Sequence, residues 1–216
     1  MKKIIAVLAI AALTLTSMES KAQAFDKNTQ IISLAIGGAV MFHIPIGYAT
    51  YYSSFYTPLT AQLYVQGEFA VHRYVGVGFT TGIGGRGPGT VGITGVYYGF
   101  YPEFNIPIGV IANFHFYQLI GDKAKKNIHS DKLDIYAGLS LGSGIAIHPG
   151  GGYYDINRNY HAGAFNDVLF FVGPQVGARY YFTPKVAVNA ELGFGKTFIN
   201  AGITFKLGGS KGDKRK

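Results

Sequence analysis

The chain has 216 residues, enough for one domain, and no cysteine, which excludes disulfides, thiolate chemistry and cysteine-based zinc sites. Charged residues make up only 14% of the sequence, less than in most soluble domains, whereas 48% are hydrophobic and 31 residues are glycine. No nucleic-acid motif accompanies the net charge of +8, so we expect the basic residues to face water and anionic lipid headgroups rather than nucleic acid.

The first 24 residues have the three-part pattern of a secretory signal peptide. Lys2 and Lys3 form a basic start, an apolar run covers 4–15, and Ala22-Gln23-Ala24 is a small-x-small cleavage site. The apolar run is too short for a bilayer, which requires about 20 helical residues. We therefore predict export, cleavage near Ala24 and a mature chain that begins at Phe25.

Behind this leader, apolar and polar residues alternate in segments divided by turn residues. In one segment Leu133, Ile135 and Leu139 share a face, and Asp134 and Tyr136 share the other. The same alternation predicts strands at 29–41, 60–72, 75–87, 93–116, 132–147, 168–182, 186–194 and 198–208. Only helices and closed barrels satisfy every backbone group in lipid. The pattern therefore predicts an all-β fold, an eight-stranded antiparallel up-and-down transmembrane β-barrel over 25–208.

Two turns allow the strand register to be predicted, because a hairpin must keep the apolar faces of both strands together. Placing Phe182 opposite Val186 aligns the apolar residues of the sixth and seventh predicted strands. At 72–74, a three-residue turn that places Val71 opposite Val75 keeps Glu68 off the lipid face. A two-residue turn there would place this carboxylate on the apolar face.

The even number of strands places both ends of the barrel domain in the periplasm, with the longer loops outside. The long loops are 43–58, 84–94 and 148–167, and residues 209–216 form a basic tail. Aromatic residues gather near the strand ends, as expected at membrane interfaces. On the outer side these are Tyr51, Tyr52, Phe55, Tyr56, Tyr97, Tyr98 and Tyr101, and on the periplasmic side Phe114, Phe116, Tyr117, Tyr180 and Phe182.

Several segments resemble the strands of small outer-membrane barrels. They are the hairpin Gly177–Gly195, the strand Asp134–Gly142 and the closing strand Ala201–Leu207. Over 25–208 the chain is similar to the outer-membrane β-barrel domain family of Bacteroidota-like Gram-negative bacteria, and more distantly to outer-membrane protein A-type barrels. The resemblance implies the fold, location in the outer membrane and insertion by the barrel assembly machinery. It differs at the end, where Leu207 and a basic tail follow Phe205 instead of a terminal aromatic.

The predicted inward face carries charges that require partners, because an eight-stranded barrel is just wide enough for its own side chains. Arg179 is predicted to face Asn189, with Glu191 on the diagonal. We expect a lumen network centred on Arg179 and Glu191, extended by Glu68 and Glu103. Inward glycines leave room for it, namely Gly76, Gly78, Gly138, Gly177 and Gly202. Its expected role is structural, and the alternative is a gate.

Three motifs suggest chemistry, but their context argues against it. The string Gly82–Gly87 fits G-x-G-x-x-G, yet Pro88 and more strand follow it instead of a helix. His148, Asp155 and His161 share a glycine-rich loop that does not suggest a preformed metal site. The adjacent residues 129–131 (His-Ser-Asp) do not make a triad, which requires converging geometry. We therefore predict no catalytic residues, no metal and no cofactor.

The function that best fits this pattern is a non-enzymatic envelope scaffold or surface-recognition protein in the outer membrane. Its expected partners are outer-membrane lipids, the assembly machinery and surface ligands bound by Tyr-rich outer loops such as 48–56. Two alternatives remain open, a porin-like narrow channel for small or apolar solutes and a lipid-modifying enzyme.

Overall fold

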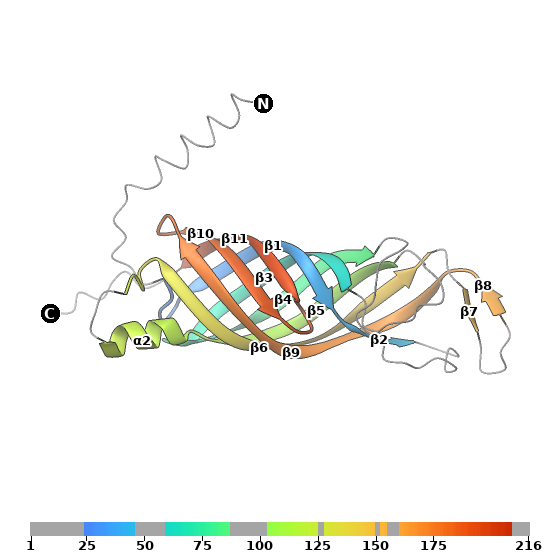
Figure 1. Ribbon diagram of the computed structural model, residues 1–216, viewed down its shortest axis with the longest axis horizontal. Coiled ribbons are helices and arrows are strands. Elements are labelled where there is room, and N and C mark those ends of the chain that lie inside the picture. Colours follow the sequence, from blue (N-terminus) through green and yellow to red (C-terminus); the bar gives the residue numbers. More distant parts are fainter. Residues whose placement is uncertain are drawn as a thin grey trace, which may run out of the picture.

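The computed structural model describes residues 24–45, 59–86, 103–124, 128–149, 152–154 and 160–208. The wall of the barrel is made of β1 (Gln30–Val40), β3 (Leu59–His72), β4 (Val75–Arg86), β5 (Glu103–Phe114), β6 (Leu133–His148), β9 (Phe165–Tyr181), β10 (Val186–Gly193) and β11 (Ile199–Gly208). The other described elements are β2 (Phe42–Pro45), β7 (Gly152–Tyr154), β8 (Tyr160–Ala162) and helix α2 (Phe116–Ala124). We call the two ends of the barrel the α2 end and the β7–β8 end, which lie at opposite extremes of Figure 1.

The wall strands close into a ring. Each strand from β3 to β6 pairs antiparallel with the next, β6 continues to β9, and β9 pairs with β10. The ring closes because β1 pairs with both β3 and β11. The predicted eight-stranded antiparallel up-and-down barrel is therefore confirmed.

Apolar side chains cover the outside of the barrel and polar ones fill the inside. Ile36, Ile108 and Leu139 are more than 60% exposed, although large apolar side chains are normally buried in water-soluble domains. On the inward face, Glu68, Asn105 and other polar residues are almost completely buried. This inversion is the pattern of a strand wall that faces lipid on one side and a polar lumen on the other.

The β9–β10 hairpin has the predicted register. Val188 lies opposite Tyr180, and Asn189 opposite Arg179. At its turn the amide of Phe182 donates to the carbonyl of Val186, 3.2 Å away. The apolar faces of the two strands coincide, as expected from the alternation.

The β3–β4 hairpin reaches the predicted register by a different route. Phe69 pairs with Val77 as expected, but His72, not Val71, lies opposite Val75. The ladder shifts between Ala70 and His72, so a β-bulge in β3 precedes a two-residue turn at 73–74. The predicted pairing of Val71 with Val75 is wrong, because the bulge supplies the extra residue that the three-residue turn was expected to supply.

Two other elements differ from the sequence prediction. The fourth strand was expected at 93–116, and β5 covers Glu103–Phe114, with 93–102 outside the described residues. The following connection was expected to be a turn, but it contains α2, which lies at one end of the barrel (Figure 1). The hydroxyl of Tyr117 donates to the carbonyl of Ile128, 2.6 Å away, and ties this helix to the next segment. Among the described residues, no helix is long and apolar enough to cross a membrane.

The β10–β11 hairpin is short, and β2 takes its place along β9. β10 has 8 residues whereas β9 has 17, so β10 reaches only as far as Gln175. Beyond this point β2 pairs with β9, placing Phe42 opposite Phe170. The hairpin tip is joined to both neighbours, since Val40 donates to Gly195 and Phe194 donates to Pro174. Toward the β7–β8 end the ring therefore no longer contains β10 and β11. The wall stays closed there because β2 pairs with β9.

Candidate functional site

The lumen is filled by large side chains that fit against glycines. A Cβ at Gly76 would overlap the Glu68 carboxylate, and a Cβ at Gly177 would overlap the ring of Tyr136. A single ring, that of Phe171, lies against both Gly109 and Gly142. The inward glycines therefore leave space that larger side chains fill, as the sequence predicted.

Near the α2 end, four charged side chains form a closed ring, which we call the ion ring. The Glu68 carboxylate lies 2.8 Å from Nε2 of His115 and 2.6 Å from the Arg179 guanidinium. The Asp134 carboxylate lies 2.8 Å from Nδ1 of His115 and 3.2 Å from the same guanidinium. Acidic and basic groups alternate, and each carboxylate oxygen has its own partner. The four residues come from β3, the β5–α2 junction, β6 and β9.

This geometry requires a protonated imidazole. Ionised carboxylates only accept hydrogen bonds, so His115 must carry a proton on each nitrogen to donate to both. His115 lies outside the strands, after Phe114. Burial acts to lower the pKa of His115, but Asp134 and Glu68 outweigh it and hold the pKa above its ordinary value. With His115 positive, the ion ring has no net charge.

Aromatic rings enclose the ion ring. Phe25 stacks on His115 with ring centroids 3.4 Å apart and planes 9° apart. On the lumen side, the Arg179 guanidinium lies 4.2 Å from the centroid of the Tyr136 ring. Phe25 and His115 both have an exposed fraction of 0%, so water does not reach their rings at this end.

A second charged group lies deeper, around Glu191. Its carboxylate accepts hydrogen bonds from Lys196 at 2.5 Å, from the Tyr136 hydroxyl at 2.7 Å and from Asn200 at 3.1 Å. The Lys196 ammonium also donates to Gln66, 2.8 Å away. Lys196 lies at the tip of the β10–β11 hairpin and points inward, with 1% exposure. The short hairpin thus supplies the cation for this buried carboxylate.

The predicted network around Arg179 and Glu191 therefore has different pairings. Arg179 is paired with Glu68 and Asp134, not with Glu191, because its side chain extends across the lumen to β3. Tyr136 stands between the two groups, with its ring against Arg179 and its hydroxyl on Glu191. Arg179, Glu68 and Glu191 thus belong to one contiguous set of contacts.

Glu103 lies apart from the other predicted lumen residues. It accepts a hydrogen bond from Asn105 at 2.9 Å, and Asn105 in turn accepts one from Gln62. Along β3, Tyr64 separates Gln62 from Gln66. An apolar cluster lies at this level of the lumen and consists of Ala35, Ala39, Met41, Tyr64, Ala146, Leu169 and Phe171. Along β3 the lumen is thus layered, with the charged groups around Glu68 nearest the α2 end, Tyr64 of the apolar cluster next, and Gln62 with Asn105 and Glu103 after it.

The motifs set aside from the sequence have structural explanations where they are described. Gly82–Arg86 of the glycine string lies within β4 rather than before a helix. His148 lies 3.0 Å from the Asp167 carboxylate, whereas Asp155 lies outside the described residues. Among the described residues, no group of three or more His, Asp or Glu side chains is arranged to hold a metal ion.

Sequence reasoning missed His115, Asp134, Tyr136 and Lys196 as members of the charged network. For Asp134 and Tyr136 the signal was present, because the alternation placed both on the inward face. Continuing the alternation of β5 past Asn113 would also have placed His115 inward. No local signal marks Lys196, because the tip of a hairpin is normally exposed to solvent.

No family model and no curated protein matches this sequence. Among solved structures, a de novo designed transmembrane β-barrel is 12% identical, with 84% of this chain and 97% of that chain covered and a TM-score of 0.38. The crystal structure of Ail, the attachment invasion locus protein of Yersinia pestis, is 12% identical over 83% of this chain and 95% of that chain, with a TM-score of 0.38. Ail in a phospholipid bilayer nanodisc is 11% identical over 84% and 100%, with a TM-score of 0.39.

Proposed function

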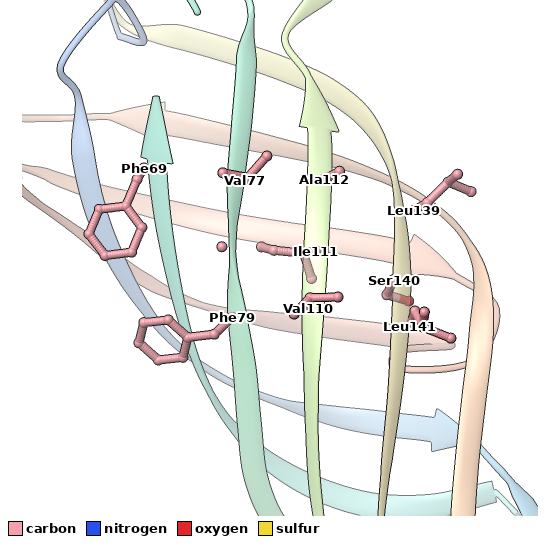
Figure 2. A pocket seen from close by; sticks show the side chains of 10 residues that line it. Phe69, Val77, Phe79, Val110, Ile111, Ala112, Leu139, Ser140 and Leu141 are labelled. Atoms are coloured by element: carbon pink, nitrogen blue, oxygen red, sulfur yellow. The ribbon is translucent and has the colours of Figure 1, made fainter. Parts of the chain in front are cut away.

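We propose that this protein is an integral outer-membrane scaffold whose barrel does not conduct and whose outer segments meet surface ligands or neighbours. The exposed apolar wall supports the membrane location. A hollow of about 520 Å³ on this wall is lined almost wholly by apolar groups (Figure 2). Phe69 and Phe79 flank it on one side, and Leu139 and Leu141 on the other. Such a surface suits lipid acyl chains and is unsuited to water.

The layered filling of the lumen is the observation that carries the non-conducting role. A solute would have to break the ion ring, displace Tyr64 and Phe171 from the apolar cluster, and then pass the buried amides. An eight-stranded barrel has little internal space beyond its side chains. The narrow-channel alternative would require a rearrangement of all three layers.

The β6–β9 hairpin supports a role in recognition. β6 pairs with β9 along its whole length, from Leu133 to His148. The small β7–β8 hairpin lies beyond the ends of the other wall strands (Figure 1). A rigid strand pair that carries a small hairpin away from the membrane would present this segment to ligands.

The processing and assembly of the chain belong to the same proposal. Residues 1–24 would be removed as a signal peptide, 25–208 would form the barrel domain, and 209–216 would remain as a basic tail. The barrel assembly machinery would insert the chain, consistent with the resemblance to Bacteroidota-like outer-membrane barrels. No catalytic role is proposed, and fatty-acid release from phospholipid by the purified barrel would contradict this.

Single-channel recording in planar lipid bilayers tests the proposal, using the processed chain refolded in detergent. The expected result is a folded barrel, seen by heat-modifiable gel mobility, that shows no discrete openings. A Tyr64→Ala, Phe171→Ala variant, which empties only the apolar cluster, should stay silent as well, because the ion ring and the amides still fill the lumen. Reproducible openings of the unmodified chain would favour the channel instead. A chain that stays soluble without detergent would overturn the membrane location.

A further inference from the structure

The ion ring depends on one proton, the second proton of the His115 imidazole. If His115 loses a proton, one of its nitrogens becomes an acceptor that faces a carboxylate oxygen at 2.8 Å. Two acceptors at this distance repel each other, so the ring must open at that contact. The remaining charges then carry a net negative charge in a space that excludes water, which is strongly unfavourable.

The N-terminal segment rests on the residue that holds this proton. Phe25 stacks on the imidazole, and the positive form of the imidazole is attracted to the face of the aromatic ring. Other contacts also hold this part of the chain. Arg73 lies 3.5 Å from the Asp26 carboxylate, and Ala70 of β3 donates to the Thr29 carbonyl at 2.8 Å. Ala24 donates to Ser130 at 3.0 Å and packs with Tyr181 and Ala187, but cleavage after Ala24 would remove these contacts. The stack of Phe25 is the contact that joins the segment to His115 of the ion ring.

We propose that residues 25–29 form a proton-controlled stopper for the α2 end of the lumen, held closed while His115 is protonated and released when it is not. The device is independent of what the outer segments bind. It goes beyond the scaffold role, because it gives this end of the barrel two states that differ in the exposure of Phe25.

The other ionisable groups near His115 come from each element around it. Glu68 of β3, Asp134 and Tyr136 of β6, and Arg179 of β9 contact the imidazole or its partners. Lys206 of β11 interacts electrostatically with Asp134, and its ammonium lies 4.7 Å from the ring centroid of Tyr181. At the β3–β4 turn, Arg73 binds Asp122 of α2 at 3.1 Å and Asp26 at 3.5 Å. Cleavage near Ala24 would add an α-amino group, which also titrates near pH 8.

Limited proteolysis measures release of the stopper. The processed chain is refolded in detergent and treated with trypsin between pH 6 and pH 9, and cleavage after Lys27 is followed by mass spectrometry. A synthetic peptide of residues 25–33 corrects for the pH dependence of the enzyme and for the α-amino group. The expected ratio of chain to peptide cleavage rises by up to about tenfold per pH unit across the titration, the limit for release of one proton.

Two matched variants separate His115 from other groups. His115→Gln removes the proton while keeping a polar side chain, so Lys27 should be cleaved at the same high ratio at every pH. His72→Gln changes an exposed histidine of the β3–β4 turn and should keep the pH dependence of the unmodified chain. A ratio that does not change with pH, or a pH dependence that survives in His115→Gln, would overturn the proposal.

If His115→Gln does not fold, histidine NMR of the unmodified barrel tests the proposal instead. The imidazole ¹⁵N shifts of the unmodified barrel should show one histidine that is doubly protonated at pH 6 and titrates above its ordinary pKa. The N-terminal amide signals should change over the same pH range. A neutral His115 at pH 6, or N-terminal signals that do not follow its titration, would contradict the stopper.

Discussion

The carboxylate of Glu68 and the guanidinium of Arg179 lie 2.6 Å apart inside the lumen, although the two residues are 111 positions apart in the sequence. Both are essentially buried, and each also contacts another member of the ion ring. This pair joins β3 to β9 across the lumen, where no backbone hydrogen bond can reach. An ion pair across the lumen therefore holds the barrel together in addition to the backbone hydrogen bonds of its wall.

Replacing Arg179 by Met should be strongly destabilising. It leaves Glu68 and Asp134 with only His115 as a cation, and breaking a buried ion pair from one side costs about 3–5 kcal/mol. Urea unfolding in detergent, followed by tyrosine fluorescence, measures the loss. Lys185→Met removes a positive charge from an exposed turn and should have little effect. Equal effects of the two variants would show that the ion ring does not stabilise the barrel.

Replacing Gly177 by Ala should also destabilise, by about 1–3 kcal/mol, because the added methyl group overlaps the ring of Tyr136. In a Tyr136→Leu background the same substitution should cost less, because the overlap is absent, although Tyr136→Leu itself loses the hydrogen bond to Glu191. Gly208→Ala is the control, since a Cβ there would have only ordinary contacts, the nearest atom being 3.7 Å away. The variants are compared by the same urea unfolding. A harmless Gly177→Ala would contradict the packing described for the lumen.

Replacing Leu141 by Arg tests which face of the wall meets lipid. Leu141 is 48% exposed near the middle of β6. An arginine at the middle of the bilayer costs about 2–4 kcal/mol, whereas near the interface the cost falls to about 0–1 kcal/mol. Gln30→Arg, at the start of β1, provides the interfacial comparison. Folding equilibria measured in lipid vesicles should show the larger loss for Leu141→Arg, and similar losses would argue against a membrane-spanning wall.

The free energy of unfolding should depend on pH through His115. Its pKa is raised in the folded state, so its contribution is complete below the unfolded pKa of about 6.5 and is lost as pH rises through the folded pKa. Urea midpoints measured from pH 6 upward should therefore fall for the unmodified chain. In His115→Gln the fall should be smaller, because the replaced side chain does not titrate. A midpoint that rises over this range would contradict a protonated His115.

The sequence by itself determined which residues line each face of the wall. A strand has a period of two, so the alternation around Asp134 and Tyr136 predicted their inward direction without knowledge of any neighbour. It also determined the register of the β9–β10 hairpin, because only one pairing keeps the apolar faces together. Both inferences depend on residues that are close in the sequence.

Only the tertiary structure decided which inward residues meet. The partner of Arg179 is on β3, across the lumen, and closure of the ring rather than any local pattern brings them together. The same holds for Lys196, whose inward direction follows from the short β10–β11 hairpin and from the hydrogen bonds of its tip to Val40 and Pro174. Strand alternation fixes the direction of a side chain, but the curvature and stagger of the closed barrel fix what lies opposite.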